Sequence, residues 1–315
     1  MKTIHFDVDS SFFPYLEGEK YPYSLRSIPK GKIFQCDAIS IKANSKVNSD
    51  TFSHFPSLKL IVTRTVGTDH IGISECKKRK IAVYRIIDYG SFAIAEHALA
   101  LMLSGARKIR EADKKVRSGV FSYDNLCGNT IHGKTIGIIG TGRIGLELIK
   151  LLKPFNTAIL AFDVFQNKKA AADLNFKYVD LDELLKNSDF ISLHTPLTPE
   201  SHHLINANTI YLMKENVTLI NTARGGLIDT QALIRNIEKF SFVGLDVLEG
   251  EENFDKKNPL LNYSNILITP HIAFYTDATI RKIAQETKKN IERFQKGEAY
   301  GLVYPSYSGP DLIGS

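Results

Sequence analysis

The sequence has few cysteines and no pattern that would use them to hold a metal ion. Its 315 residues contain three, Cys36, Cys76 and Cys127, which are odd in number and far apart. No two cysteines have the CxxC spacing of a zinc or redox site, so the sequence predicts no metal site. This cysteine usage favours a reducing compartment over a disulfide-forming one.

Long apolar runs and targeting signals are also missing. No uncharged apolar run approaches the roughly 18 residues of a membrane span. The N-terminus lacks the basic stretch followed by an apolar stretch that is typical of a secretory leader. We therefore expect a cytoplasmic protein with no membrane partner.

Positive charge is present but not concentrated. The net charge of +6 is spread along the chain, which argues against a nucleic-acid partner. The densest basic run, residues 77–80, is expected at the end of a surface helix, where the helix dipole favours cations. Attraction of an anionic substrate is a second interpretation of this charge.

The chain has no repeat or low-complexity segment, and short strands alternate with helical patterns. This alternation predicts an α/β protein with two flavodoxin- or Rossmann-like domains and parallel sheets. Residues 91–272 are expected to form a nucleotide-binding domain inserted into the other domain, residues 1–90 and 273–315. Strands are expected at 3–6, 38–41, 58–63, 81–84, 135–139, 158–162, 190–193, 218–221, 242–246 and 265–269, and long helices at 92–118 and 276–294.

A glycine-rich motif follows the apolar run 135–139. The motif reads GTGRIG, and an amphipathic run continues from it. In a strand–turn–helix unit, Gly140 permits the turn, Gly142 lets the backbone approach a pyrophosphate, and Gly145 lets the helix pack closely on the strand. The helix N-terminus then offers its N–H groups to the phosphates. The motif therefore predicts a dinucleotide site.

An acidic residue stands where the ribose of such a cofactor would lie. Asp163 ends the strand 158–162 and lies 23 residues after Gly140. A carboxylate there binds the ribose hydroxyls and repels a 2′-phosphate, which favours NAD over NADP. Lys168 and Lys169 keep NADP open as an alternative. The plainer interpretation is a structural glycine turn with a solvated Asp163.

Three later strands end in residues that suit one reaction. Arg224, a group of acids within 244–251, and His271 each follow an apolar run. Ligands of open α/β sheets bind beyond the carboxyl ends of the strands. Each residue alone would usually be a polar surface residue. Together they supply what hydride transfer to a 2-oxo acid requires, namely a cation for the carboxylate, an acid for the keto oxygen and a carboxylate beside that acid.

With these residues in place, the sequence resembles the D-isomer-specific 2-hydroxyacid dehydrogenase family. The likeness runs from about Cys36 to Phe294 and is strongest to the D-lactate dehydrogenase branch, which includes the vancomycin-resistance type. The shared motifs are, in order, residues 65–71 (TVGTDHI), 94–97 (IAEH), 140–145, 194–198 (HTPLT), 221–226 (NTARGG), 244–251 (GLDVLEGE) and 270–271 (PH).

The resemblance implies a role for each matching residue. Arg224 would bind the substrate carboxylate and keto oxygen, and His271 would donate the proton. Glu251 would pair with His271, whereas the nearby Glu249 would not. Substrate contacts would come from the amides of Val66 and Gly67 and from the side chains of Tyr89 and Phe274. Cofactor contacts would come from Gly140, Gly142, Arg143, Ile144, Gly145, Asp163, Thr195, Pro196, Ser201, Thr222, Ala223 and Asp246.

The implied activity is NADH-dependent reduction of a small 2-oxo acid to the D-2-hydroxy acid, and the reverse, by a homodimer joined through helix 92–118. Alternatives are a hydroxypyruvate, glyoxylate or branched 2-oxo acid reductase of the same family, and a non-catalytic NAD(H)-sensing interaction protein. The formate type resembles this pattern with Gln in place of Glu251. Residues 42–45 match poorly where the family lines the outer pocket, so the substrate side chain stays open.

Overall fold

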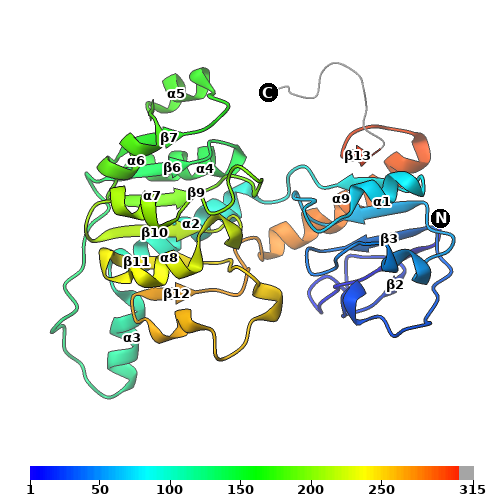
Figure 1. Ribbon diagram of the computed structural model, residues 1–315, viewed down its shortest axis with the longest axis horizontal. Coiled ribbons are helices and arrows are strands. Elements are labelled where there is room, and N and C mark those ends of the chain that lie inside the picture. Colours follow the sequence, from blue (N-terminus) through cyan, green and yellow to red (C-terminus); the bar gives the residue numbers. More distant parts are fainter. Residues whose placement is uncertain (305–315) are drawn as a thin grey trace. The chain divides into compact units, whose positions relative to one another are not determined.

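The computed structural model describes residues 1–304 and divides the chain into two compact units. Unit 1 comprises Met1–Gly90 together with the segment that begins at Tyr275, and unit 2 comprises Ser91–Phe274. Both units are shown in Figure 1. The sequence placed the second boundary after residue 272. None of the described helices is long and apolar enough to cross a membrane.

Unit 1 is built on a six-stranded sheet of order β13-β5-β4-β3-β1-β2. Its strands are β1 (Thr3–His5), β2 (Glu19–Lys20), β3 (Ala38–Ile41), β4 (Leu60–Thr63), β5 (Ala82–Arg85) and β13 (Leu302–Tyr304). β13 pairs antiparallel with β5, whereas the other neighbours are parallel. The predicted α/β fold with two parallel-sheet domains is confirmed, and the antiparallel pairing is confined to this edge strand. An antiparallel edge strand on a parallel sheet is common in α/β folds.

Both faces of this sheet are buried because its strands are apolar at successive positions. Ile39 and Ile61 point into one core, which also contains an aromatic group around Phe6. Leu60 and Val62 point to the other face, where the long helix α9 packs. The helices of the unit are α1 (Ile73–Lys78) and α9 (Asp277–Lys296), with the short 3-10 helices η1 (Leu25–Ser27) and η2 (Asp50–His54).

Unit 2 is built on a seven-stranded parallel sheet of order β12-β11-β10-β9-β6-β7-β8. The strands are β6 (Thr135–Ile139), β7 (Ala158–Phe162), β8 (Lys177–Tyr178), β9 (Phe190–Leu193), β10 (Val217–Asn221), β11 (Phe240–Leu245) and β12 (Ile266–Ile268). The strand order reverses between β6 and β9. In open sheets of this kind, that switch point is where ligands bind.

Helices cover both faces of the second sheet. They are α2 (Ser91–Ala106), α3 (Ile109–Arg117), α4 (Arg143–Leu152), α5 (Lys168–Leu174), α6 (Leu181–Asn187), α7 (Ala207–Leu212) and α8 (Thr230–Arg235), with 3-10 helices η3 (Lys153–Phe155), η4 (Gly225–Leu227), η5 (Ile237–Lys239), η6 (Glu251–Asn253) and η7 (Pro259–Asn262). Leu101 and Met102 of α2 share one core with Leu148 of α4. Leu184 and Leu233, from α6 and α8, belong to the core on the other face.

The single helix predicted at 92–118 is wrong, because the chain breaks between α2 and α3. Lys108 has φ 50°, a left-handed conformation that ends the first helix. α2 buries an apolar stripe, whereas α3 buries no residue. The side chain of Arg110 bonds the carbonyls of Ser264 and Ile266 and so ties α3 to β12. The change from apolar to charged residues after Arg107 marks the point where the chain leaves the core.

Candidate active site

The glycine-rich turn of unit 2 has the geometry of a phosphate site. Gly140 adopts φ 97°, and a Cβ there would lie 2.6 Å from the carbonyl carbon of His194. A Cβ on Gly145 would lie 2.1 Å from the Gly140 carbonyl oxygen, so the start of α4 packs tightly on the turn. Gly142 is the N-cap of α4, and a Cβ on it would meet open space. The backbone is therefore exposed just where the helix dipole favours an anion.

The turn also holds the acid at the end of β7. One carboxylate oxygen of Asp163 accepts hydrogen bonds from the Thr141 amide at 2.6 Å and from its hydroxyl at 2.9 Å. The other oxygen accepts from the Phe165 amide at 2.9 Å. The Tyr178 hydroxyl lies 2.7 Å from that of Thr141. These bonds fix the orientation of Asp163, the residue predicted to bind the ribose. The sequence did not single out Thr141 or Tyr178.

The loop after β9 lies against the same turn. A Cβ on Gly140 would lie 2.7 Å from the Thr195 amide nitrogen. The hydroxyl of Ser201 donates to the Pro196 carbonyl at 2.7 Å and accepts from the Thr198 amide at 2.8 Å. Thr195, Pro196 and Ser201 thus belong to one closed loop, and their contacts with a cofactor stay a prediction.

Arg224 follows β10 in a loop that Asn221 shapes from within. Asn221 is fully buried; its amide nitrogen donates to the Arg224 carbonyl at 2.8 Å, and its amide oxygen accepts from the Ala223 amide at 3.0 Å. The Arg224 guanidinium donates to the Ala223 carbonyl at 2.7 Å. The loop thereby presents Arg224 from a rigid strand end, which suits a side chain that must hold a carboxylate.

Glu251 and His271 are brought together from two other strand ends. Nδ1 of His271 lies 2.7 Å from Oε1 of Glu251, and the other carboxylate oxygen accepts from the Leu248 amide at 3.2 Å. Burial raises the pKa of Glu251, but the hydrogen bond and charge of His271, the Leu248 bond and the charge of Arg224 together lower that pKa below its usual value. Glu251 is therefore ionised at neutral pH, and it fixes the tautomer of the imidazole.

Asp246 has an internal role that the sequence did not predict. Its side chain is 1% exposed. It accepts hydrogen bonds from the hydroxyl of Thr269 at 2.5 Å and from the amides of Ile272 and Ala273 at 2.9 Å each. These bonds hold the turn in which His271 takes φ 55°. Asp246 thus positions the histidine, and its predicted contact with the cofactor remains a prediction.

One buried polar atom fits a bound nicotinamide. The Thr222 hydroxyl oxygen is buried and has no hydrogen-bond partner among the described residues. Such an atom costs about 1–3 kcal/mol when it stays unpaired, so its presence at a strand end indicates a ligand group. Thr222 is one of the predicted cofactor contacts, and the residues present therefore fit NAD.

The predicted substrate contacts of unit 1 lie in the loop after β4 and just before its boundary. Val66 is 40% exposed. The Thr65 hydroxyl donates to the Gly67 carbonyl at 2.6 Å and so shapes this loop. No described backbone acceptor takes a hydrogen bond from the amides of Val66 and Gly67. Tyr89 lies half-buried in unit 1, and Phe274, in unit 2, lies edge-on to His271 with ring centroids 6.3 Å apart.

Sequence reasoning missed a buried cation behind the Val66 loop. Arg64 is 1% exposed and donates to the Ser40 hydroxyl at 2.6 Å, to the Asp7 carbonyl at 3.1 Å and to the Phe6 carbonyl. It joins the ends of β1, β3 and β4. The only local signal was an arginine at the end of an apolar strand, the same signal that identified Arg224.

The comparisons with known proteins agree with this geometry. Residues 99–273 match the family described as D-isomer specific 2-hydroxyacid dehydrogenase, NAD binding domain. The chain belongs to this family. It is 35% identical to D-lactate dehydrogenase of Escherichia coli (strain K12) over 309 residues, 93% of this chain and 91% of that protein. It is also 38% identical to glyoxylate reductase of Thermococcus litoralis over 299 residues, 92% of this chain and 88% of that protein.

Solved structures of the D-2-hydroxyacid dehydrogenase family share the fold. D-lactate dehydrogenase from Aquifex aeolicus, complexed with NAD and lactic acid, matches with a TM-score of 0.87 and 35% identity over 97% of this chain and 100% of that one. This protein is thus an NAD-dependent 2-hydroxyacid dehydrogenase, with its NAD domain inserted into the substrate domain.

Proposed function

We propose that this dehydrogenase reduces a small 2-oxo acid to the D-2-hydroxy acid, with pyruvate as the preferred substrate and D-lactate as the product. The observation that carries the proposal is the 2.7 Å pair between His271 and Glu251, at strand ends of the unit that also presents Arg224. It is the acid–carboxylate arrangement that protonation of a keto oxygen requires.

His271, Glu251 and Arg224 each have a separate role in the proposed reaction. Bound NADH supplies the hydride. His271 holds a proton on Nε2 and donates it to the keto oxygen, because Nδ1 is engaged by Glu251. The negative charge of Glu251 favours the protonated ring. Arg224 binds the carboxylate with two N–H groups and stabilises the charge that develops on the keto oxygen.

The relatives support two substrate classes. One relative is a D-lactate dehydrogenase, and the solved D-lactate dehydrogenase of Aquifex aeolicus is complexed with lactic acid. Relatives named glyoxylate reductase have similar identity, 38% for the Thermococcus litoralis protein. Glyoxylate reduction is therefore the second candidate, and it uses the same three side chains.

The deciding experiment follows NADH oxidation with pyruvate, 2-oxobutyrate, 4-methyl-2-oxopentanoate, phenylpyruvate, hydroxypyruvate and glyoxylate, each repeated with NADPH. The proposal expects the highest kcat/KM with pyruvate and a preference for NADH. A preference for glyoxylate or a bulky acid would replace the substrate and keep the reaction. Tight NADH binding with no turnover would favour an NAD(H)-sensing protein.

We propose that the protein is a homodimer joined through the region around residues 92–118, now resolved into α2 and α3. α2 buries six of its sixteen residues within unit 2, whereas α3 buries none, so α3 and the segment after it offer the most exposed surface of this region. That segment exposes Phe121 by 94% and Tyr123 by 88%, and α3 exposes Ile109 by 57%. Exposed aromatic groups of this kind mark interaction surfaces. Sedimentation of a monomer at micromolar concentration would contradict the dimer.

The cytoplasm remains the proposed compartment. All three cysteines are free. Burial raises the pKa of the Cys36 and Cys76 thiols to about 11 in each case, so both stay protonated and unreactive. Free, inert thiols fit a reducing environment.

A further inference from the structure

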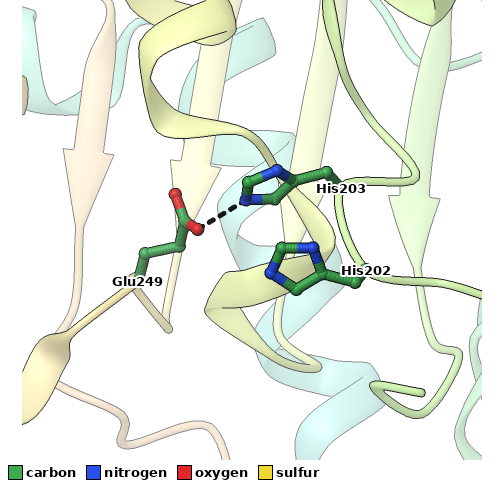
Figure 2. Close-up of side chains that lie close together, drawn as sticks. All are labelled: His202, His203 and Glu249. Atoms are coloured by element: carbon green, nitrogen blue, oxygen red, sulfur yellow. Dashed lines mark hydrogen bonds and ion pairs between the residues drawn. The ribbon is translucent and has the colours of Figure 1, made fainter. Parts of the chain in front are cut away.

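Two histidines and a glutamate lie together in unit 2, outside the predicted catalytic residues (Figure 2). One ligand atom from each of His202, His203 and Glu249 lies within 4.8 Å of the others. Nε2 of His203 is 2.7 Å from Oε1 of Glu249, and the two imidazole rings stack with centroids 3.9 Å apart at 30°. We call these three residues the His–His–Glu cluster.

The backbone explains why two consecutive histidines share one side of the chain. In an extended chain, successive side chains point in opposite directions. His203 instead has φ 52°, in the left-handed region that non-glycine residues rarely adopt. Its amide donates to the Gly226 carbonyl at 2.8 Å, and its carbonyl accepts from the Asn206 side chain at 2.9 Å. The chain therefore keeps an unfavourable conformation that brings both rings beside Glu249.

The carboxylate of the cluster is oriented from behind. Oε2 of Glu249 accepts from the Thr230 amide at 3.0 Å and from the Thr230 hydroxyl at 2.5 Å. These bonds leave Oε1 directed towards the histidines, as Figure 2 shows. Hydrogen bonds that fix the far side of a ligand are the usual outer support of metal sites.

We propose that the His–His–Glu cluster binds a divalent transition-metal ion of the zinc type. Two imidazoles and one carboxylate form a donor set that suits zinc, with water as the fourth ligand. Bond lengths of about 2.0–2.2 Å at tetrahedral angles require two ligand atoms to be about 3.3–3.6 Å apart. His203 and Glu249, 2.7 Å apart, must therefore separate by about 0.6–0.9 Å. The His202 ring must also turn out of its stack on His203, because stacked rings do not direct their nitrogen lone pairs at one ion. His202 is exposed, so an ion and its water can reach the cluster.

A bound ion would join two segments of the NAD-binding unit. His202 and His203 belong to the segment after β9, next to Ser201, and Glu249 lies after β11, two residues before Glu251. The ion would restrain both segments and raise the resistance of the unit to heat. The local spacing of residues could not predict this cluster, because the fold brings together positions 46 residues apart.

The test uses the full chain without an affinity tag, in a Cys127→Ser background so that no exposed thiol competes for metal. After treatment with a chelator, Zn²⁺ is titrated by calorimetry and the Tm is measured with and without it. We expect one ion per chain and a higher Tm with Zn²⁺. His202→Ala should weaken binding by at least roughly tenfold and abolish the rise in Tm, since even loss of an outer partner costs 10–100-fold.

His132→Ala is the matched control, because His132 is an exposed histidine of the same unit outside the cluster. It should bind Zn²⁺ as the parent does. Circular dichroism shows that each variant is folded, and His203→Asn provides a second removal of a ligand. Binding that is absent in the parent, that survives His202→Ala and His203→Asn, or that falls equally in His132→Ala overturns the proposal.

Discussion

Two histidine–glutamate pairs take their glutamates from the segment after β11. Their nitrogen–oxygen distances, the signs of their histidine φ angles and their side-chain exposures are nearly the same. The dyad consists of His271 and Glu251, and the capping pair consists of His203 and Glu249. Both have a nitrogen–oxygen distance of 2.7 Å, and both histidines have positive φ. Side-chain exposure is 36% and 35% in the dyad and 34% and 31% in the capping pair. Neither distance nor burial tells them apart.

What differs is the partner of the second carboxylate oxygen. In the dyad, that oxygen of Glu251 meets a single amide, and the positive charge of Arg224 also acts on it. In the capping pair, that oxygen of Glu249 is held by the amide and hydroxyl of Thr230 at the start of α8. Burial raises the pKa of Glu249, but the bonds from Thr230 and His203 lower it below its usual value. The two pairs thus differ in their surroundings and not in their own geometry, and these surroundings are why we propose the dyad, and not the capping pair, as the catalytic one.

The largest contrast between the pairs is expected when each histidine is removed. His271→Ala should lower kcat for 2-oxo acid reduction by about 10²- to 10⁴-fold, because general acid catalysis contributes that much. His203→Ala should lower kcat by roughly tenfold at most, because only the packing of a loop changes. Steady-state assays in chelator measure both. Near-normal turnover in His271→Ala would remove its role as proton donor.

The cation beside the dyad provides the next contrast. Arg224→Lys keeps the charge and loses the planar fork, so KM for the 2-oxo acid should rise and kcat fall. We expect kcat/KM to drop by roughly 10²-fold, as for the loss of one oxyanion donor. Arg235→Lys is the matched control, because Arg235 is exposed in the last turn of α8. Equal effects of both substitutions would contradict direct substrate binding by Arg224.

The charge of Glu251 should set the pH range of reduction. Burial raises the pKa of Glu251, but the hydrogen bond and charge of His271 lower that pKa below its usual value, so Glu251 stays charged throughout the neutral range. Glu251→Gln removes this charge, so the pH profile of kcat/KM should move. The pH profile of the parent and the variant measures the shift. A profile that stays in place in Glu251→Gln, or moves as far in Glu249→Gln, would show that the dyad is not the titrating unit.

Short-range sequence signals predicted much of the fold and of the dyad. Short apolar runs predicted strands such as β7 and β9, and the motif at Gly140 predicted the turn, because a strand, a tight turn and a helix start are local events. Glu251 was separated from Glu249 only through resemblance to a family. The residues alone could not do this, since both acids follow the same strand.

The remaining features depend on contacts between distant positions. The buried carboxylate of Asp246 is explained by donors 23 to 27 residues away. The His–His–Glu cluster needs the left-handed backbone at His203. No local pattern predicts such features, because each is stabilised by packing that the whole unit provides.

The smallest expected effect concerns the free energy of unfolding. Here the capping pair should matter more than the dyad, which is the reverse of their expected order in catalysis. Glu249→Gln keeps the size of the side chain. It removes a negative charge that lies against the start of α8, where the Glu249 carboxylate accepts a hydrogen bond from the Thr230 amide at 3.0 Å. The free energy of unfolding should fall by about 0.3–1 kcal/mol, whereas Glu251→Gln, which caps no helix, should lower it less. Urea denaturation in chelator compares them. A larger loss of stability in Glu251→Gln would show that the dyad, and not the capping pair, supports the fold.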